Sequence, residues 1–308
     1  MVLCVGEILA DMIGAKTDDG VCYYERRAGG APFNVACAVI RFGGRARFFG
    51  CVGDDAIGDF LIDFATKRGL DGCDIARSGT HNTTMAFVEL DGAGERSFSF
   101  YRKNTADMFL PRIPNAQIEQ ANIIHIGSLM LSAPRGQKYA AELVSRAHSL
   151  GKRVSFDVNY RSDIFENEYA AVSAYKSIAE QVDIIKLSES EVGIFTDGFI
   201  NERLSDKTVI ISLGARGSEW RYKRRKNTVP TLSVTPVDTT GAGDAFLGGV
   251  LAKLDGSAER EFSDGALDCA LAFGNACGAL TTLGRGAIDA LPSSDEAERA
   301  VCALINRG

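Results

Sequence analysis

The second half of the chain alternates between short apolar runs and amphipathic stretches. Four apolar runs have the length of a buried strand: residues 123–126, 153–158, 182–187 and 209–213. Apolar residues at helical spacing separate them, over residues 135–150, 168–180 and 189–195. Strands that alternate with helices in this order predict a parallel sheet with helices on both faces, which is a doubly wound α/β fold.

The first half starts with the same rhythm and then departs from it. It contains a strand over residues 2–5, a helix over 35–42 and a strand over 47–52. Two segments break the alternation: residues 12–27, which follow the first strand and turn at 18–20, and residues 83–102, a hairpin whose arms are rich in β-branched or aromatic residues. We interpret these segments as a small β-sheet lid inserted in a single domain that spans residues 1–308.

The last third of the chain carries a glycine-rich stretch between two predicted elements. An alternating run over residues 229–237 predicts a strand, and residues 245–254 predict a helix. Between them lies DTTGAGDAF, residues 238–246, whose small residues fall at a predicted strand-to-helix turn. A hairpin over 219–232 turns at the basic run KRRKN, which in an acidic chain is typical of a solvated turn.

The glycine-rich stretch has the residues of an anion site. Gly241, Ala242 and Gly243 can direct their backbone N–H groups to one point in front of a helix N-terminus, which suits a phosphoryl group. Asp244 follows at once, and a carboxylate there suits a hydroxyl whose proton leaves as phosphate arrives. The same residues fit a packing turn with an aspartate in the first helical turn, and the local pattern leaves both interpretations open.

Polar residues also follow the predicted parallel strands, where open α/β sheets bind their ligands. They are Asp157, Asn159 and Arg161 after one strand, Lys186, Ser188 and Glu191 after the next, and Ser212, Gly214 and Gly217 after a third. In the first half, Asp11 lies in an apolar segment, and Asn34 follows the paired glycines Gly29 and Gly30. A carboxylate beside a group that both donates and accepts hydrogen bonds favours recognition of a polyol.

Composition and charge exclude several classes of function. The chain has 308 residues, a net charge of −6 and a pI of about 5.3, which argue against general nucleic-acid binding and against a basic membrane surface. No apolar run approaches a membrane span, and the N-terminus lacks the basic region of a signal peptide. The eight cysteines form no CxxC pair, and the three histidines show no metal-ligand spacing. We therefore expect a cytoplasmic protein whose cysteines are mostly small buried apolar residues.

Several motifs together resemble a known family. DTTGAGDAF is similar to the C-terminal signature of the PfkB (ribokinase-like) carbohydrate kinases, and GGAPFNVA, RFGG, FFGCVGDDAIG and GERSFSFYR resemble the N-terminal half of that family. The likeness covers essentially the whole chain in the family's order, and GGAPFNVA, FYRKNTADM and DVNYR resemble the fructokinase branch most closely. The resemblance implies a ribokinase-like fold, a mainly parallel sheet flanked by helices, with a β lid that closes over the sugar and forms a homodimer contact.

The resemblance also implies an activity and a set of site residues. The activity is ATP-dependent transfer of the γ-phosphoryl group to a primary hydroxyl of a free sugar, fructose first, with Mg²⁺. Asp244 matches the catalytic base, and Gly241, Ala242 and Gly243 match the anion hole. Substrate-binding positions are matched by Asp11, Gly29, Gly30, Asn34 and Arg161, to which we add Phe98 on the apolar face of the lid. The predicted nucleotide-binding residues are Lys186, Ser188, Ser212, Gly214, Gly217 and Asn275.

The metal positions match the family only in part. Asp238 and Thr240 match positions that contribute to a monovalent-cation site, for K⁺, in some members. Glu191 matches the glutamate of an N-x-x-E motif that organises Mg²⁺ through water, but Ser188 stands where that motif has asparagine. This difference weakens the magnesium assignment more than the assignment of activity.

Alternative functions remain open within and outside the family. Within it they are 2-keto-3-deoxygluconate kinase, ribokinase and nucleoside kinase. A nicotinamide-dependent oxidoreductase would need G-x-G-x-x-G after the first strand, and a P-loop enzyme would need GxxxxGK[ST]; the chain contains neither motif. A non-catalytic regulator that binds sugar or nucleotide is the remaining rival, and the Asp244 carboxylate beside the GAG turn argues against it.

Overall fold

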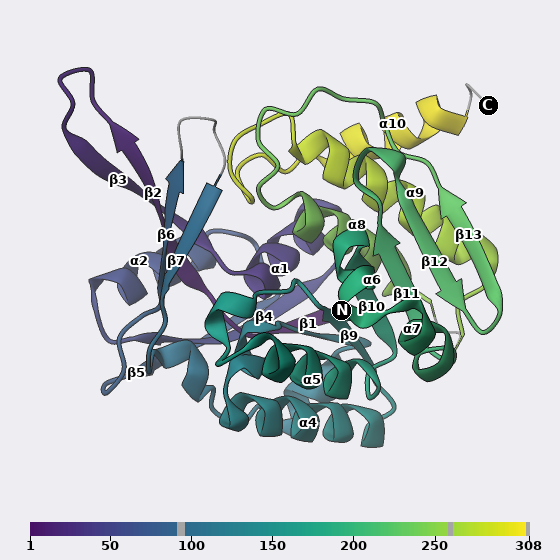
Figure 1. The fold of residues 1–308 in the computed structure, drawn as a ribbon, viewed down its shortest axis with the longest axis horizontal. Helices are drawn as coiled ribbons and strands as arrows, with labels where there is room; N and C mark the ends of the chain where they lie inside the picture. Colours follow the sequence, from purple (N-terminus) through teal and green to yellow (C-terminus); the bar gives the residue numbers. More distant parts are fainter. Residues whose placement is uncertain (91–95, 258–260, 306–308) are drawn as a thin grey trace.

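The chain folds around one large sheet, shown in Figure 1. The computed structural model describes residues 1–90, 96–257 and 261–305. Within these residues nine strands form the main sheet, in the order β13-β12-β11-β10-β9-β8-β1-β4-β5. Their bounds are β1 (Val2–Val5), β4 (Ala46–Gly53), β5 (Gly72–Ser78), β8 (Ile123–Ile126), β9 (Arg153–Asp157), β10 (Ile184–Ser188), β11 (Thr208–Ser212), β12 (Ser218–Tyr222) and β13 (Arg225–Val229). The strands from β5 to β11 pair in parallel and the last two are antiparallel, so the predicted doubly wound sheet is confirmed.

Both faces of the main sheet are covered by helices. Successive residues of β1 point to opposite faces: Val2 and Cys4 join one apolar cluster, whereas Leu3 and Val5 join the other. The helices on the first face are α1 (Ala31–Arg41), α2 (Ala56–Thr66), α8 (Ala242–Leu254), α9 (Asp264–Thr281) and α10 (Ser294–Ile305). Those on the second face are α3 (Asn115–Gln120), α4 (Pro134–Ser149), α5 (Glu168–Ala179), α6 (Glu189–Phe195) and α7 (Asp197–Arg203). Burial on both sides explains why β1 is continuously apolar rather than alternating.

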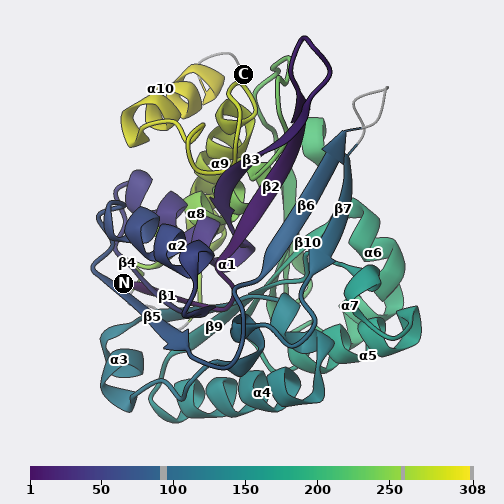
Figure 2. The ribbon, with the colours of Figure 1, turned by 90° about the vertical axis from the view of Figure 1, so that its left-hand side faces the viewer.

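A second sheet projects from the main body, at the upper left of Figure 1 and on the near side of Figure 2. It contains β2 (Leu9–Lys16), β3 (Cys22–Gly29), β6 (Met85–Leu90) and β7 (Arg96–Tyr101). The order is β3-β2-β6-β7, and the two hairpins join through a parallel pairing of β2 with β6. Both hairpins expected from the sequence are therefore present, and they form one small sheet.

One predicted strand is wrong. The alternating run after Val229 pairs with no other strand in the described part of the chain. Pro230 and Pro236 carry no N–H for a ladder, while the N–H groups of Val237 and Asp238 donate to Thr282 O at 2.7 and 3.1 Å. The run is thus an extended segment that packs on the end of α9, and the GAG turn is reached from this segment rather than from a strand.

Other elements also differ from the expectation: helix α1 begins at Ala31, four residues earlier than predicted. Helix α8 begins at Ala242, three residues earlier than predicted, which places Asp244 in its first turn. Strand β5 was not predicted, because its sequence GCDIARS mixes polar and apolar residues at the sheet edge, where only β4 pairs with it.

Burial of the cysteines matches the expectation only in part. All eight carry free thiols. Cys4, Cys37, Cys51 and Cys277 are buried, whereas Cys22, Cys269 and Cys302 are exposed. Among the described helices none is at once long and apolar enough to cross a membrane.

Candidate active site

A cavity of about 350 Å³ lies between the main sheet and the small sheet. Eleven of the residues selected from the sequence line it: Asp11, Gly30, Asn34, Asp157, Asn159, Arg161, Lys186, Thr240, Gly241, Gly243 and Asp244. They come from β2, the start of α1, the end of β9 and the segment after it, β10, the segment after β13 and the start of α8. The fold therefore gathers residues from both halves of the chain around one space.

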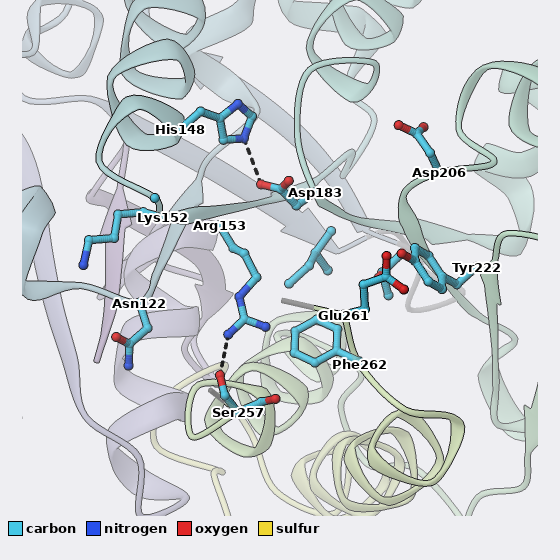
Figure 3. Close-up of a pocket in the computed structure, with 13 residues that line it drawn as sticks. Asn122, His148, Lys152, Arg153, Asp183, Asp206, Tyr222, Ser257, Glu261 and Phe262 are labelled. Atoms are coloured by element: carbon cyan, nitrogen blue, oxygen red, sulfur yellow. Dashed lines mark hydrogen bonds and ion pairs between the residues drawn. The ribbon is translucent and has the colours of Figure 1, made fainter. Parts of the chain in front are cut away.

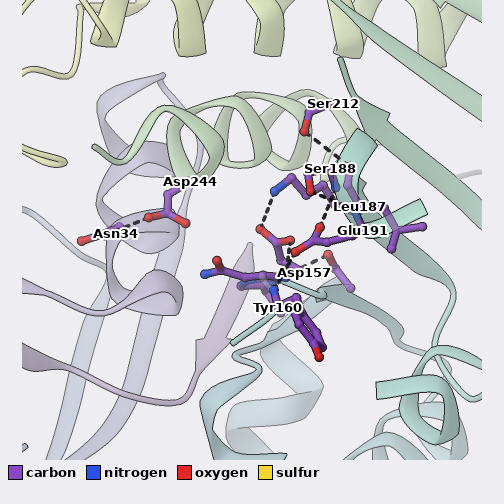
Figure 4. Close-up of polar contacts among 12 residues, drawn as sticks. Asn34, Asp157, Tyr160, Leu187, Ser188, Glu191, Ser212 and Asp244 are labelled. Carbon is purple, nitrogen blue, oxygen red and sulfur yellow. Dashed lines mark hydrogen bonds and ion pairs between the residues drawn. The ribbon is translucent and has the colours of Figure 1, made fainter. Parts of the chain in front are cut away.

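The carboxylate of Asp244 is held at the N-terminus of α8. Gly241 precedes this helix with φ 74°, and no side chain caps the helix within the described residues. Except for that of Ala242, which donates to Thr239 O at 3.3 Å, the N–H groups at this terminus can bind an anion. Asn34 Nδ2 on α1 donates to Asp244 Oδ2 at 2.9 Å, as Figure 4 shows. This bond fixes one carboxylate oxygen and leaves the other able to accept a hydrogen bond from a ligand hydroxyl.

Burial raises the pKa of Asp244 above its usual value. The hydrogen bond from Asn34 and the positive charges of Lys186 and Arg161 oppose this shift without cancelling it. A carboxylate with a raised pKa is a better proton acceptor than an ordinary aspartate.

A buried ion pair lies beside the GAG turn. Lys186 Nζ on β10 lies 3.0 Å from Asp157 Oδ2 at the end of β9, and the two residues are only 6% and 3% exposed. Burial raises the pKa of Asp157 to about 6, against the opposing effect of Lys186. Burial alone would lower the pKa of Lys186, but Asp157, Glu191 and Asp244 together hold it above its usual value. A Cβ placed on Gly243 would lie 3.4 Å from Lys186 Nζ, so a charged ammonium borders the predicted anion hole.

Glu191 and Ser188 form a capping box at the start of α6. Ser188 Oγ accepts from Glu191 N at 3.4 Å, and Ser188 N donates to Glu191 Oε2 at 2.6 Å. Tyr160 N donates to the other carboxylate oxygen, also at 2.6 Å. The serine found in place of the family's asparagine is therefore a good N-cap.

The residues near Glu191 fit a magnesium ion only through water. Its two carboxylate oxygens already accept backbone hydrogen bonds, which leaves lone pairs for a bound water. Within the described residues no three His, Cys, Asp or Glu side chains gather as a metal cage. Mg²⁺ usually keeps several waters and binds substrate phosphates, which suits such a sparse set.

The predicted nucleotide-binding residues mostly lie beside the cavity rather than in its wall. Ser212 ends β11 next to Ser188 of β10. Gly214 and Gly217 follow with φ 59° and 94°, and a Cβ on Gly217 would lie 2.1 Å from Val229 O, so only glycine fits there. The Asn275 amide donates to Val229 O and Pro230 O at 3.0 and 3.2 Å. Asn275 thus ties α9 to the end of β13, and its contact with adenine stays a prediction.

Asp238 organises the segment that was expected to hold a monovalent cation. Its Oδ1 accepts from Thr240 N and Thr240 Oγ1 at 2.8 and 2.7 Å, and its Oδ2 accepts from Gly286 N at 3.1 Å. These bonds close the segment against the turn after α9, and the binding of a monovalent cation there stays a prediction.

The structure also adds residues that sequence reasoning missed. Glu7 after β1 and Phe100 on β7 line the cavity. The side chain of Phe98, which we had predicted to contact substrate, lies outside the described part of the chain. Glu7 could have been found by the strand-end rule that selected Asp157, because it follows the buried run VLCVG directly.

A larger cavity of about 800 Å³, shown in Figure 3, lies at the opposite edge of the sheet. Its wall includes residues that precede or begin β8, β9 and β10: Asn122, Arg153 and Asp183. His148 pairs with Asp183 at 2.9 Å, and Arg153 donates to Ser257 O at 2.8 Å. The amino ends of parallel strands are not where open α/β sheets bind substrates, so we assign the active site to the smaller cavity.

Gly241→Ala is expected to lower both turnover and stability. The new Cβ would lie 2.4 Å from the Cβ of Ala287, and alanine at this positive φ costs about 1–2 kcal/mol. Gly151→Ala is the matched control, since Gly151 has φ 70° with nothing within 4 Å of its Cβ position. Urea denaturation and steady-state kinetics should show a larger stability loss for Gly241→Ala and a kcat loss of about tenfold or more in that variant alone. Equal behaviour of the two variants would contradict a tight anion hole.

Comparison with known proteins gives consistent results. The sequence profile of pfkB family carbohydrate kinases matches residues 1–294. Probable fructokinase-5 of Arabidopsis thaliana is 35% identical over 316 residues, covering 97% of this chain and 96% of that protein. The crystal structure of a Xylella fastidiosa fructokinase with bound ATP has a TM-score of 0.90 at 31% identity, covering 99% of this chain and 98% of that one. A Vibrio cholerae O395 fructokinase in a fructose, ADP and calcium ion bound form has a TM-score of 0.85 at 29% identity, covering 97% and 98% of the two chains.

These matches bear out two expectations from the sequence. The structural neighbours confirm the ribokinase-like fold with its small second sheet. The relatives confirm that the motifs are most similar to the fructokinase branch. Since the family profile covers residues 1–294 of 308, the chain belongs to the pfkB family of carbohydrate kinases.

Proposed function

We propose that the protein is an ATP-dependent kinase that phosphorylates a primary hydroxyl of free fructose. The observation that carries the proposal is the placement of Asp244. Its carboxylate is bonded to Asn34, stands at the uncapped N-terminus of α8 and shares one cavity with Lys186. This arrangement offers a proton acceptor, anion-binding N–H groups and a positive charge at a single point.

The proposed reaction needs little covalent chemistry from the protein. A bond forms between the sugar oxygen and the γ-phosphorus, the bond from that phosphorus to the bridging oxygen of ADP breaks, and the hydroxyl proton passes to Asp244. Phosphoryl transfer is largely dissociative, so the proton can leave late and positioning supplies most of the catalysis. The hydrogen bond from Asn34 orients the carboxylate toward the cavity for this task.

Charge stabilisation is assigned to the backbone of the GAG turn and to nearby cations. Gly241, Gly243 and Lys186 line the space where the phosphoryl group would pass, whereas Ala242 N donates to Thr239 O at 3.3 Å. Arg161 lines the same cavity, where we assign it to the sugar. When bound, Mg²⁺ would neutralise phosphate charge, with Glu191 holding one of its waters. Asp238 and Thr240 are proposed to hold K⁺ behind the turn.

We assign the small sheet the role of a lid, because the strand register gives it two different faces. Asp11 pairs with Ala86, and Ala86 pairs with Phe100, so one row of the sheet faces the cavity that Asp11 and Phe100 line. Closure of this row over the sugar would exclude water and limit wasteful ATP hydrolysis.

The opposite face of the lid supports a homodimer. It carries an aromatic cluster, in which the Phe87 ring centroid lies 5.0 Å from that of Tyr24 and 4.9 Å from that of Tyr101. Tyr24 and Tyr101 are 43% and 62% exposed. We propose that a second copy of the chain covers this face, in the cytoplasm, where the free thiols stay reduced. A monomeric mass measured by light scattering at micromolar protein concentration would contradict the proposed homodimer.

A substrate screen tests the activity. Coupled ADP release should be fastest with fructose among fructose, ribose, 2-keto-3-deoxygluconate and adenosine, and K⁺ should stimulate it. A higher kcat/KM for another acceptor would show that this acceptor, rather than fructose, is the substrate, and the proposed kinase activity would stand. If no acceptor stimulates ADP release but fructose or ATP binds in calorimetry, the protein is a binding regulator and the kinase proposal fails.

A further inference from the structure

Glu7, which follows β1, has a buried carboxyl group without a hydrogen-bond partner among the other described residues. The residue is 2% exposed and lines the cavity that contains Asp244. Neither of its carboxylate oxygens accepts a hydrogen bond from another described residue. A Cβ on Gly127 would lie 2.7 Å from Glu7 Oε2, so the glycine after β8 is what makes room for this carboxyl group. Buried polar groups without partners are costly and uncommon, so this one calls for a ligand.

A second unpartnered oxygen lies in the same wall. The Asn34 amide nitrogen donates a hydrogen bond to Asp244, but its Oδ1 is buried and accepts no hydrogen bond within the described part of the chain. The backbone of Gly30 lies between Asn34 and Glu7. Asn34 N donates to Gly30 O at 2.8 Å, and a Cβ on Gly30 would lie 2.5 Å from Glu7 O. The backbones of Glu7 and Asn34 are thus close, and both unsatisfied side chains belong to residues that line the same cavity.

We propose that the Glu7 carboxyl is a further sugar-binding group, which hydrogen-bonds a sugar hydroxyl that also donates to Asn34 Oδ1. A hydroxyl is suited to this place because it carries one donor and two acceptor lone pairs. It donates to the amide oxygen and accepts from the carboxylic acid. The inference rests on the proposed function, since it assumes that the cavity takes a sugar.

Glu7 can act as a donor while its carboxyl group is protonated. Burial raises its pKa to about 8, and the negative charges of Asp107 and Asp244 add to the shift, while its own backbone N–H and Arg102 oppose it. These charged groups face Glu7 from three elements: Asp107 from the short helix Ala106–Phe109, Arg102 from the end of β7, and Asp244 from α8. Above this pH Glu7 loses its donor and becomes a second anion beside Asp244, so sugar affinity should fall.

Kinetics from pH 6.5 to 9 test the proposal with two variants of Glu7. Glu7→Ala should raise the fructose KM at pH 7 about tenfold and leave the ATP KM within about twofold, since one sugar hydrogen bond is lost. Glu7→Gln keeps a donor and an acceptor, so its fructose KM at pH 7 should stay within about threefold of the parent value. The parent KM should rise above pH 8, whereas that of Glu7→Gln should stay flat across this range.

Asp107→Asn is the control for lost stability. Asp107 is also buried, and it accepts from Arg102 Nε at 2.6 Å and from Thr105 Oγ1 at 2.9 Å, but it does not line the cavity. This variant should have a lower Tm and still show an alkaline rise in fructose KM, moved to lower pH because the charge of Asp107 no longer raises the pKa of Glu7. Two results would contradict sugar binding by Glu7: an unchanged fructose KM in Glu7→Ala, or an alkaline rise of KM in Glu7→Gln equal to that of the parent. Neither result would contradict the proposed kinase activity. Absence of fructose-stimulated ADP release in the parent protein would instead show that the proposed function is wrong, and this inference with it.

Discussion

Asp244→Asn is expected to lower kcat by at least about 10²-fold and to change fructose binding little. Asparagine keeps the size of the side chain, and its oxygen can still accept the hydrogen bond from Asn34. It cannot accept the hydroxyl proton, so only the step in which that proton leaves is lost. Steady-state kinetics with the coupled assay and calorimetry of fructose binding would measure the two effects separately.

Asp264→Asn is the matched control, since Asp264 is likewise an aspartate in the first turn of a helix, α9, but lies outside the cavity. Its kcat should stay within about twofold, because the change affects only a weak helix-terminus interaction and an exposed ion pair with Arg225, both outside the cavity. Near-normal turnover in Asp244→Asn would show that Asp244 is not the proton acceptor. It would favour the alternative interpretation, in which Asp244 belongs to a packing turn.

The pH profile gives a second check on Asp244. Only the ionised carboxylate can accept a proton, and burial raises its pKa above the ordinary 3.8. The acid limb of kcat/KM should therefore lie at higher pH than for an exposed aspartate, and activity should fall as pH decreases through that raised pKa. Asp244→Asn should lack this limb.

Lys186→Met is expected to reduce both turnover and stability. Removal of the ammonium leaves Asp157 buried and unpaired, which typically costs about 3–5 kcal/mol of unfolding free energy. It also removes the positive charge beside Gly243, so kcat should fall about 10²-fold. Urea denaturation and kinetics at saturating ATP and fructose would give the two quantities.

The double variant Asp157→Asn/Lys186→Met separates the two effects. With both charges of this ion pair gone, neither partner is left buried and unpaired, so most of the lost stability should return. Turnover should not return, because the positive charge near the GAG turn is still absent. Recovery of kcat together with stability would show that Lys186 only maintains the fold.

Prediction from the sequence was most successful where local pattern and burial agree. The apolar runs that became β1, β8, β9, β10 and β11 are buried on both faces, and this requirement can be read from the residues alone. The alternating run after Val229 failed as a strand because alternation does not supply a pairing partner, and two prolines removed needed donors. Strand β5 was also not predicted, because polar and apolar residues are mixed in its sequence at the edge of the sheet.

The candidate site was predicted by residue type, but several roles depended on tertiary contacts. The strand-end rule and the family resemblance selected Asp244, Asn34 and Lys186, and all three line one cavity. The strand-end rule and the family resemblance could not show that Asn34 hydrogen-bonds Asp244 across 210 residues of sequence. They also could not show that the Asn275 amide donates to carbonyl oxygens at the end of β13. Side-chain partners far apart in sequence are set by packing, which leaves no local signal.

The sequence by itself determined the doubly wound sheet, the two hairpins, the GAG turn with Asp244 and the family likeness, because periodicity and motif spacing are local properties. Only the tertiary structure decided that the hairpins form one sheet beside the cavity, that Lys186 pairs with Asp157, and that Glu7 lies buried without a partner. Burial and charge pairing depend on distances between segments that are remote along the chain. These distances set the pKa values of Asp244 and Glu7, and with them the chemistry that we assign to the site.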